Sequence, residues 1–89
     1  MTRRNRIEVI YDILNSIREK GRLKPTHILY KANLSHKKMT NYLEELESKE
    51  MLKKREEHGK MFYLLTEKGF KFLMEYSKIK EFEKSFGLD

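Results

Sequence analysis

The spacing of the apolar residues changes twice along this 89-residue sequence. Up to about residue 49 they recur every three or four positions, which is typical of helices that bury one face. The following residues hold two runs rich in strand formers, "MLKKREE" and "KMFYLLT", on either side of "HG". Two such runs joined by a short glycine-containing turn predict a β-hairpin. Helical spacing returns after the hairpin, so the pattern predicts a mainly α fold with one small β-hairpin.

Three helices are predicted before the hairpin. The first spans residues 6–19 and ends near Gly21, a candidate C-terminal cap. A short second helix is expected at residues 26–31. The third begins at Ser35, a favourable N-cap residue, and ends at about residue 49. The residues of these helices that are expected in the core are Ile7, Ile10, Tyr11, Ile13, Leu14, Ile17, Ile28, Leu29, Met39, Tyr42, Leu43 and Leu46.

A long last helix is predicted from Glu67, capped by Thr66, to about Phe86. At 1.5 Å per residue it would be about 30 Å long, so a small three-helix body covers only part of it. The residues expected to pack back on the body are Phe70, Leu73 and Met74. Residues 1–66 are therefore interpreted as the main domain and residues 67–89 as a dimerisation helix within the same compact unit.

A heptad spacing of apolar residues in this last helix is the pattern of paired helices. Positions 65, 72, 79 and 86 are all apolar, and further aromatic residues lie between them. The residues predicted to form a dimer interface are Phe72, Tyr76, Ile79, Phe82 and Phe86. Tyr76, Ile79, Phe82 and Phe86 should be exposed unless a second copy covers them. The alternative is that the helix lies flat on the domain and uses these residues as core.

The composition argues against an enzyme. Apolar residues make up 38% of the chain and charged residues another 38%, which allows one core but little material for a deep substrate cavity. Cysteine is absent, which excludes disulfides and thiolate zinc sites. The three histidines share no ligand spacing. No catalytic residue, metal site, cofactor or small-molecule ligand is predicted.

The N-terminal stretch "MTRRNRIEVIYDIL" begins with basic residues, as a signal peptide does, but Glu8 and Asp12 interrupt its apolar run. The longest apolar run, "MFYLL", is far shorter than a membrane-spanning segment. We therefore expect a cytoplasmic protein without a membrane partner.

The positive charge of the chain is concentrated in its first half. The formal net charge is +6, yet residues 1–43 hold ten basic and three acidic residues, whereas residues 44–89 hold ten basic and eleven acidic ones. Such asymmetry favours a polyanion as partner, because the neutralisation of phosphates dominates affinity for nucleic acids. The alternative is a lysine-rich surface that serves only solubility.

The stretches "IEVIYDILNSI", "THILYKANLSHKKMTNYLEELESKEML" and "YLLTEKGFKFL" resemble small archaeal winged helix-turn-helix DNA-binding proteins that dimerise through a C-terminal coiled-coil helix. The resemblance spans almost the whole chain. It implies the order helix, helix, helix, hairpin, helix, and a homodimer bound to double-stranded DNA as a transcriptional regulator or a nucleoid-associated protein. The sequence departs from these proteins at Glu50, where they commonly have glycine. A left-handed conformation of a non-glycine residue there would cost roughly 1 kcal/mol.

In such a fold the third helix, residues 35–49, is expected to enter the major groove. With Met39, Leu43 and Leu46 buried, the polar residues of its first turns face outward. The residues expected to contact DNA are Ser35, His36, Lys37, Lys38, Thr40 and Asn41. Asparagine pairs with adenine and lysine donates to guanine, whereas the acidic second half of the helix repels phosphate. The alternative is that these are ordinary solvated positions of an amphipathic helix.

Further contacts are predicted outside the third helix. The candidates in the hairpin are Arg55, His58 and Lys60, those in the N-terminal arm are Arg3, Arg4 and Arg6, and those around the second helix are Lys24, Thr26 and Lys31. The alternatives are a hairpin without contacts and a solvated N-terminus. At the level of function, the alternatives are a protein–protein interaction module of the transcription machinery, with the acidic half of the third helix in the interface, and a binder of structured RNA.

Overall fold

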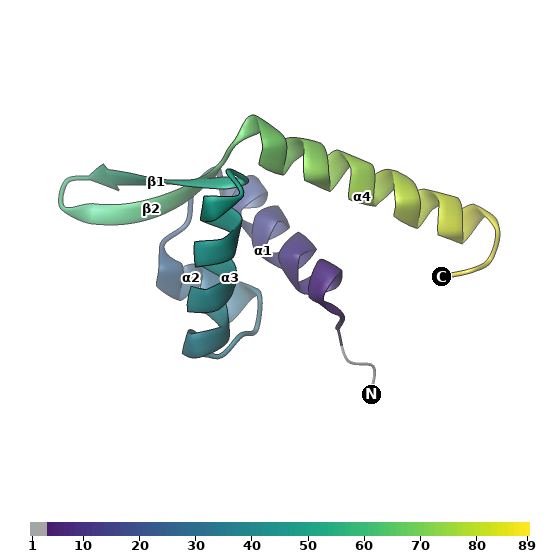
Figure 1. Cartoon of the computed structure of the whole chain (residues 1–89), viewed down its shortest axis with the longest axis horizontal. Coiled ribbons are helices and arrows are strands. Elements are labelled where there is room, and N and C mark those ends of the chain that lie inside the picture. Colours follow the sequence, from purple (N-terminus) through teal and green to yellow (C-terminus); the bar gives the residue numbers. More distant parts are fainter. Residues whose placement is uncertain (1–3) are drawn as a thin grey trace.

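The computed structural model describes residues 4–89, and in that range the helices and strands follow the predicted order (Figure 1). The elements are α1 (Arg6–Lys20), α2 (Pro25–Lys31), α3 (His36–Ser48), β1 (Leu52–Glu57), β2 (Lys60–Leu65) and α4 (Glu67–Ser85). The predicted fold class, mainly α with one β-hairpin, is confirmed. Helix α2 begins at Pro25, one residue before the predicted start, because proline is well suited to a first helical turn.

The core lies between α1, α2, α3 and the hairpin. Its largest fully buried side chains are Ile13, Leu14, Ile17, Ile28, Leu46 and Leu52. Three of them lie on α1, whose first turn is fixed by a capping box between Asn5 and Glu8. Helix α3 buries Met39, Leu43 and Leu46, as its periodicity predicted. The opposite side of α3 is left to the solvent.

The hairpin β1–β2, called the wing below, is antiparallel and runs in register from Leu52 opposite Leu65 to Glu57 opposite Lys60. Its two turn residues, His58 and Gly59, have φ angles of 51° and 77°. Positive φ at both positions is the geometry of a type I′ turn, which matches the twist of the strands. The wing projects away from the helices, to the left in Figure 1.

The link between α1 and α2 lies beside β2 as a very short third strand. Leu23 and Tyr63 exchange two backbone hydrogen bonds, with N–O distances of 3.1 and 2.8 Å. Both side chains are buried. The link and the wing are thereby held together, although about 40 residues of sequence separate them.

Helix α3 ends in a Schellman motif with glutamate at the position usually taken by glycine. The N–H of Met51 donates to the carbonyl of Leu46 (2.9 Å), and the N–H of Glu50 donates to that of Glu47 (3.0 Å). Glu50 has a φ of 61°, so it adopts the left-handed conformation that disfavours side chains. The hydroxyl of Thr66, which also caps α4, donates to the carbonyl of Glu50 (2.6 Å) and fixes this exit from the helix.

Replacing Glu50 with glycine is therefore expected to stabilise the fold by about 1 kcal/mol, because glycine adopts this conformation without a steric penalty. The midpoint of chemical unfolding measures the change. Glu50→Ala is the matched control, since it removes the same charge and keeps the unfavourable φ. Equal stability of the glycine and alanine variants would contradict the explanation.

Helix α4 packs on the domain only through its first turns and then extends past it, to the right in Figure 1. Gly69 and Leu73 are buried. A Cβ atom at Gly69 would overlap the carbonyl oxygen of Met51, so glycine allows the close approach of α4 to the start of the wing. One helical turn beyond Leu73, the ring of Tyr76 stacks on that of Tyr11 in α1, with centroids 4.5 Å apart.

Two expectations for α4 are wrong within the single chain. Phe70 and Met74 were expected to pack on the domain, but they are 48% and 62% exposed, because the packed face of the helix is centred on Gly69, Leu73 and Tyr76. Tyr76 was expected to be exposed in the absence of a second copy, but its contact with Tyr11 leaves it half-buried. None of the helices within residues 4–89 has the length and apolar character needed to cross a membrane.

Candidate nucleic-acid interface

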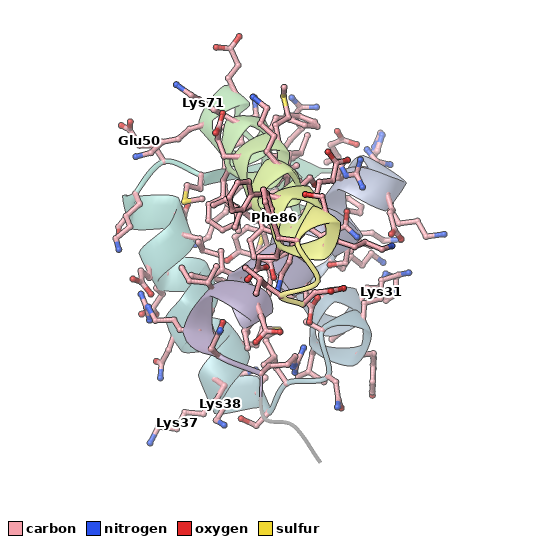
Figure 2. All side chains as sticks on the ribbon, turned by 90° about the vertical axis from the view of Figure 1, so that its right-hand side faces the viewer. Lys31, Lys37, Lys38, Glu50, Lys71 and Phe86 are labelled. Atoms are coloured by element: carbon pink, nitrogen blue, oxygen red, sulfur yellow. The ribbon has the colours of Figure 1, made fainter. Side chains whose placement is uncertain are left out.

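The first two turns of α3 form an exposed, positively charged surface. Ser35 caps the helix by accepting a hydrogen bond from the backbone N–H of Lys38 (3.3 Å). The exposed side chains of this segment are those of Ser35, His36, Lys37, Lys38 and Asn41. Lys37 and Lys38 lie at the end of the molecule distant from Glu50 and Lys71 (Figure 2), and Lys37 points outward. Two lysines and an amide are thus presented together on one helix end.

Thr40 differs from its neighbours. Its side chain is half-buried, and its hydroxyl donates to the carbonyl of His36 (3.0 Å). A threonine hydroxyl bonded in this way to the preceding turn is already satisfied within the helix. The methyl group is therefore the part of Thr40 available for an apolar contact.

Two of the three carboxylates in the second half of α3 are paired with cations of the same chain, whereas Glu44 is exposed and has no ion pair among the described residues. Glu45 forms ion pairs with Arg6 of α1 and with Lys49, the latter at 2.9 Å. Glu47 lies 3.4 Å from the ammonium of Lys54 in β1. These contacts offset the charge of Glu45 and Glu47, whereas the carboxylate of Glu44, one turn after Asn41, stays exposed beside the basic surface.

The two described arginines of the predicted N-terminal arm are held against the domain. Arg4 donates to the carboxylate of Asp12 (2.7 Å) and to the carbonyl of Asn33 (3.1 Å), while Arg6 pairs with Glu45. Arg3 lies outside the described residues. Together with α3 they surround a shallow depression whose lining includes Arg4, Arg6, Asn33, Ser35, Lys38, Asn41 and Glu45. Arg4 and Arg6 thus extend the polar surface of α3 toward α1.

The candidate residues of the wing and of α2 are also at the surface. Arg55, His58 and Lys60 are exposed, with His58 in the turn itself. Around α2, Thr26 and Lys31 are exposed and Lys24 is half-buried. The wing residues and the start of α3 lie on different elements of a chain whose principal extents are 48, 29 and 22 Å.

Two basic residues that the sequence did not single out also lie at the wing. Arg22 is placed beside β2 by the pairing of Leu23 with Tyr63, and Lys53 lies on β1 two residues before Arg55. The alternation in "RLK", one apolar residue between two cations, is the signal that could have identified the short strand. Burial raises the pKa of the Tyr63 hydroxyl, despite the opposing effect of Lys54.

The described residues hold no cluster of three or more histidine, aspartate or glutamate side chains suited to a metal ion. The site consists of hydrogen-bond donors and cations on a rigid helix and a projecting hairpin. Such a site can bind anions and polar edges in a fixed geometry.

Comparisons with known proteins agree with this geometry. The winged helix-turn-helix family model matches residues 3–84 of the chain. No curated protein matches the sequence. Among solved structures, Sso10a-2, a DNA-binding protein from Sulfolobus solfataricus, is 26% identical, with a TM-score of 0.76 over 94% of this chain and 90% of that one.

Other solved structures share the fold at lower identity. The YusO protein from Bacillus subtilis is 18% identical, with a TM-score of 0.81, and the alignment covers 90% of this chain and 59% of that one. A MarR family transcriptional regulator from Silicibacter pomeroyi is 20% identical, with a TM-score of 0.76, and the corresponding shares are 88% and 54%. The chain thus spans little more than half of these longer proteins.

Proposed function

Because this chain belongs to the winged helix-turn-helix family, we propose that it binds double-stranded DNA as a homodimer and acts as a transcriptional regulator or nucleoid-associated protein. The start of α3 lies in the major groove, where Lys37 and Asn41 face base edges and Lys38 faces phosphate. His58, in the turn at the tip of the wing, contacts the backbone of the same duplex.

One observation carries the proposal: the first two turns of α3 are exposed and basic, and two of the three acids that follow them, Glu45 and Glu47, are paired inside the chain. The likeness to Sso10a-2, described as a DNA-binding protein, supports it over nearly the full length of both chains. The same ion pairs weigh against the alternative of a protein-binding module, because Glu45 and Glu47 are not free to form an acidic interface.

The homodimer is proposed on the exposed distal part of α4. Ile79, Phe82 and Phe86 are 60%, 60% and 66% exposed. Phe82 and Phe86 contact each other, with ring centroids 4.9 Å apart, on a helix that has left the domain. A second copy of the same helix would bury these side chains and set two α3 helices at a fixed distance along a duplex.

Titration of duplex DNA with the protein at increasing salt concentration tests the proposal. If Lys37 and Lys38 each neutralise one phosphate of this duplex, the logarithm of the binding constant falls with the logarithm of the salt concentration with a slope of roughly −2 per protomer. Failure to bind any duplex, or binding with a flat salt dependence, would contradict DNA binding through these residues.

A further inference from the structure

The two faces of the wing differ in composition. Successive side chains of a strand point to opposite faces, and residues paired across the strands share a face. Lys54 and its partner Tyr63 lie on the inner face, since Tyr63 is buried and Lys54 pairs with Glu47 of α3. Lys53 and Arg55 therefore lie on the outer face, opposite Leu64 and Phe62.

The link between α1 and α2 adds two cations to this outer face. Its central residue, Leu23, is buried, so the side chains on either side of it point away from the core. The guanidinium carbon of Arg22 lies 4.3 Å from the ring centroid of Phe62, and the ammonium of Lys24 lies 6.0 Å from it. Both distances are within the range of cation–π contacts. We call this surface the outer wing face; its members are Arg22, Lys24, Lys53, Arg55, Lys60, Glu57 and Phe62.

The outer wing face carries an excess of positive charge, since it holds five cations and one acid. Its one acid, Glu57, forms an ion pair with Arg22 and lies 3.7 Å from Arg55. The side chains of Arg22, Lys53, Arg55 and Lys60 are exposed. Phe62 stays half-buried beneath Arg22 and holds the guanidinium in place, which lowers the entropy lost when that group binds an anion.

We propose that the outer wing face binds the phosphate backbone of a second DNA duplex, other than the duplex that lies against α3. Charge complementarity favours a polyanion, and the absence of a base-reading helix makes the contact independent of sequence. A duplex fits better than a single strand, because the one aromatic ring of this face is covered by Arg22 and offers no stacking surface. The outer wing face and the helices lie on opposite sides of the sheet, so the two duplexes do not compete. The proposal rests on the proposed function in one respect, that α3 holds the first duplex.

The test uses the full chain and two duplexes. One duplex is immobilised and saturated with protein, and capture of a second, labelled duplex is measured. Arg22→Gln combined with Lys53→Gln is expected to lower capture at least fivefold while binding of the first duplex is retained. Lys78→Gln combined with Lys84→Gln, two exposed lysines of α4, is the control with the same loss of charge. Lys53→Gln alone is a second variant, because Lys53 makes no ion pair within the described residues and its loss leaves Arg22 on Phe62.

A second arm separates this inference from the proposed function. In a Lys37→Ala, Asn41→Ala background, the remaining duplex binding is expected to be weak and salt-dependent, and Arg22→Gln with Lys53→Gln lowers its salt slope by about 2. If Arg22→Gln with Lys53→Gln changes neither the capture of the second duplex nor the salt slope, the inference is overturned and the proposed function stays intact. If instead the α3 substitutions have no effect and the Arg22 and Lys53 substitutions abolish all binding, the role of α3 fails and the outer wing face stands. Stronger competition by single-stranded RNA than by duplex would also overturn the choice of partner.

Discussion

Replacing both Lys37 and Asn41 with alanine is expected to lower the affinity of the protein for duplex DNA by roughly 30-fold or more. Each side chain is exposed on the outer side of α3, where it is free to reach a base edge. A good contact of this kind contributes about 1 to 3 kcal/mol, so losing two costs at least about 2 kcal/mol. Titration of labelled duplex at fixed salt concentration measures the loss.

The free energy of unfolding of this variant should stay within about 0.5 kcal/mol of that of the wild type, because neither side chain packs in the core. Asn15→Ala combined with Lys84→Ala replaces the same residue types on α1 and α4, and it should leave the affinity for DNA unchanged. If the α3 variant binds DNA as well as the wild type, α3 is not the reading helix. If wild type and variant both fail to bind DNA but retain a protein partner, the chain is a protein-binding module instead.

Replacing both Ile79 and Phe86 with glutamate is expected to convert the proposed dimer into a monomer. These two side chains lie on the same side of α4, on the part of the helix that extends past the domain, and both are largely exposed in the single chain. Two glutamates in each copy would place like charges in a seam that must exclude water. Light scattering after size-exclusion chromatography measures the mass directly.

The same variant should bind DNA more weakly than the wild type, because a dimer holds its second α3 at a high effective concentration once the first is bound. Phe70→Glu combined with Met74→Glu is the matched control: both residues are exposed on α4, but at a spacing that places them on the other side of the helix. A dimer that survives the Ile79 and Phe86 substitutions, or a wild-type protein that is monomeric, would exclude the distal seam.

Local patterns in the sequence were sufficient for the order and type of the elements. Ser35 and Thr66 cap helices as predicted, because a side-chain oxygen reaches an N–H three residues on and needs no distant partner. The "HG" turn forms the wing, since two residues with positive φ close a hairpin by local geometry alone. The buried face of α3 follows from the spacing of Met39, Leu43 and Leu46.

The tertiary structure decided which charges are free. Arg6 and Glu45 are 39 positions apart, and nothing in their spacing predicts the ion pair that ties the N-terminal arm to α3. The same holds for Arg22, which reaches Phe62 and Glu57 only because Leu23 pairs with Tyr63. Each of these contacts depends on how separate helices and strands pack together. The spacing of apolar residues within one element does not predict that packing.

Helix α4 shows both sides of this division. Its apolar residues are numerous enough to occupy more than one face, so periodicity predicted that a helix forms and that part of it pairs with a second copy. Which residues the domain covers was decided by the approach of Gly69 to Met51 and by the stack of Tyr76 on Tyr11. That approach turned Phe70 and Met74 to the solvent. The sequence by itself therefore determined the elements and the faces available for burial, and only the packed chain selected among those faces, because burial is a property of three-dimensional neighbours.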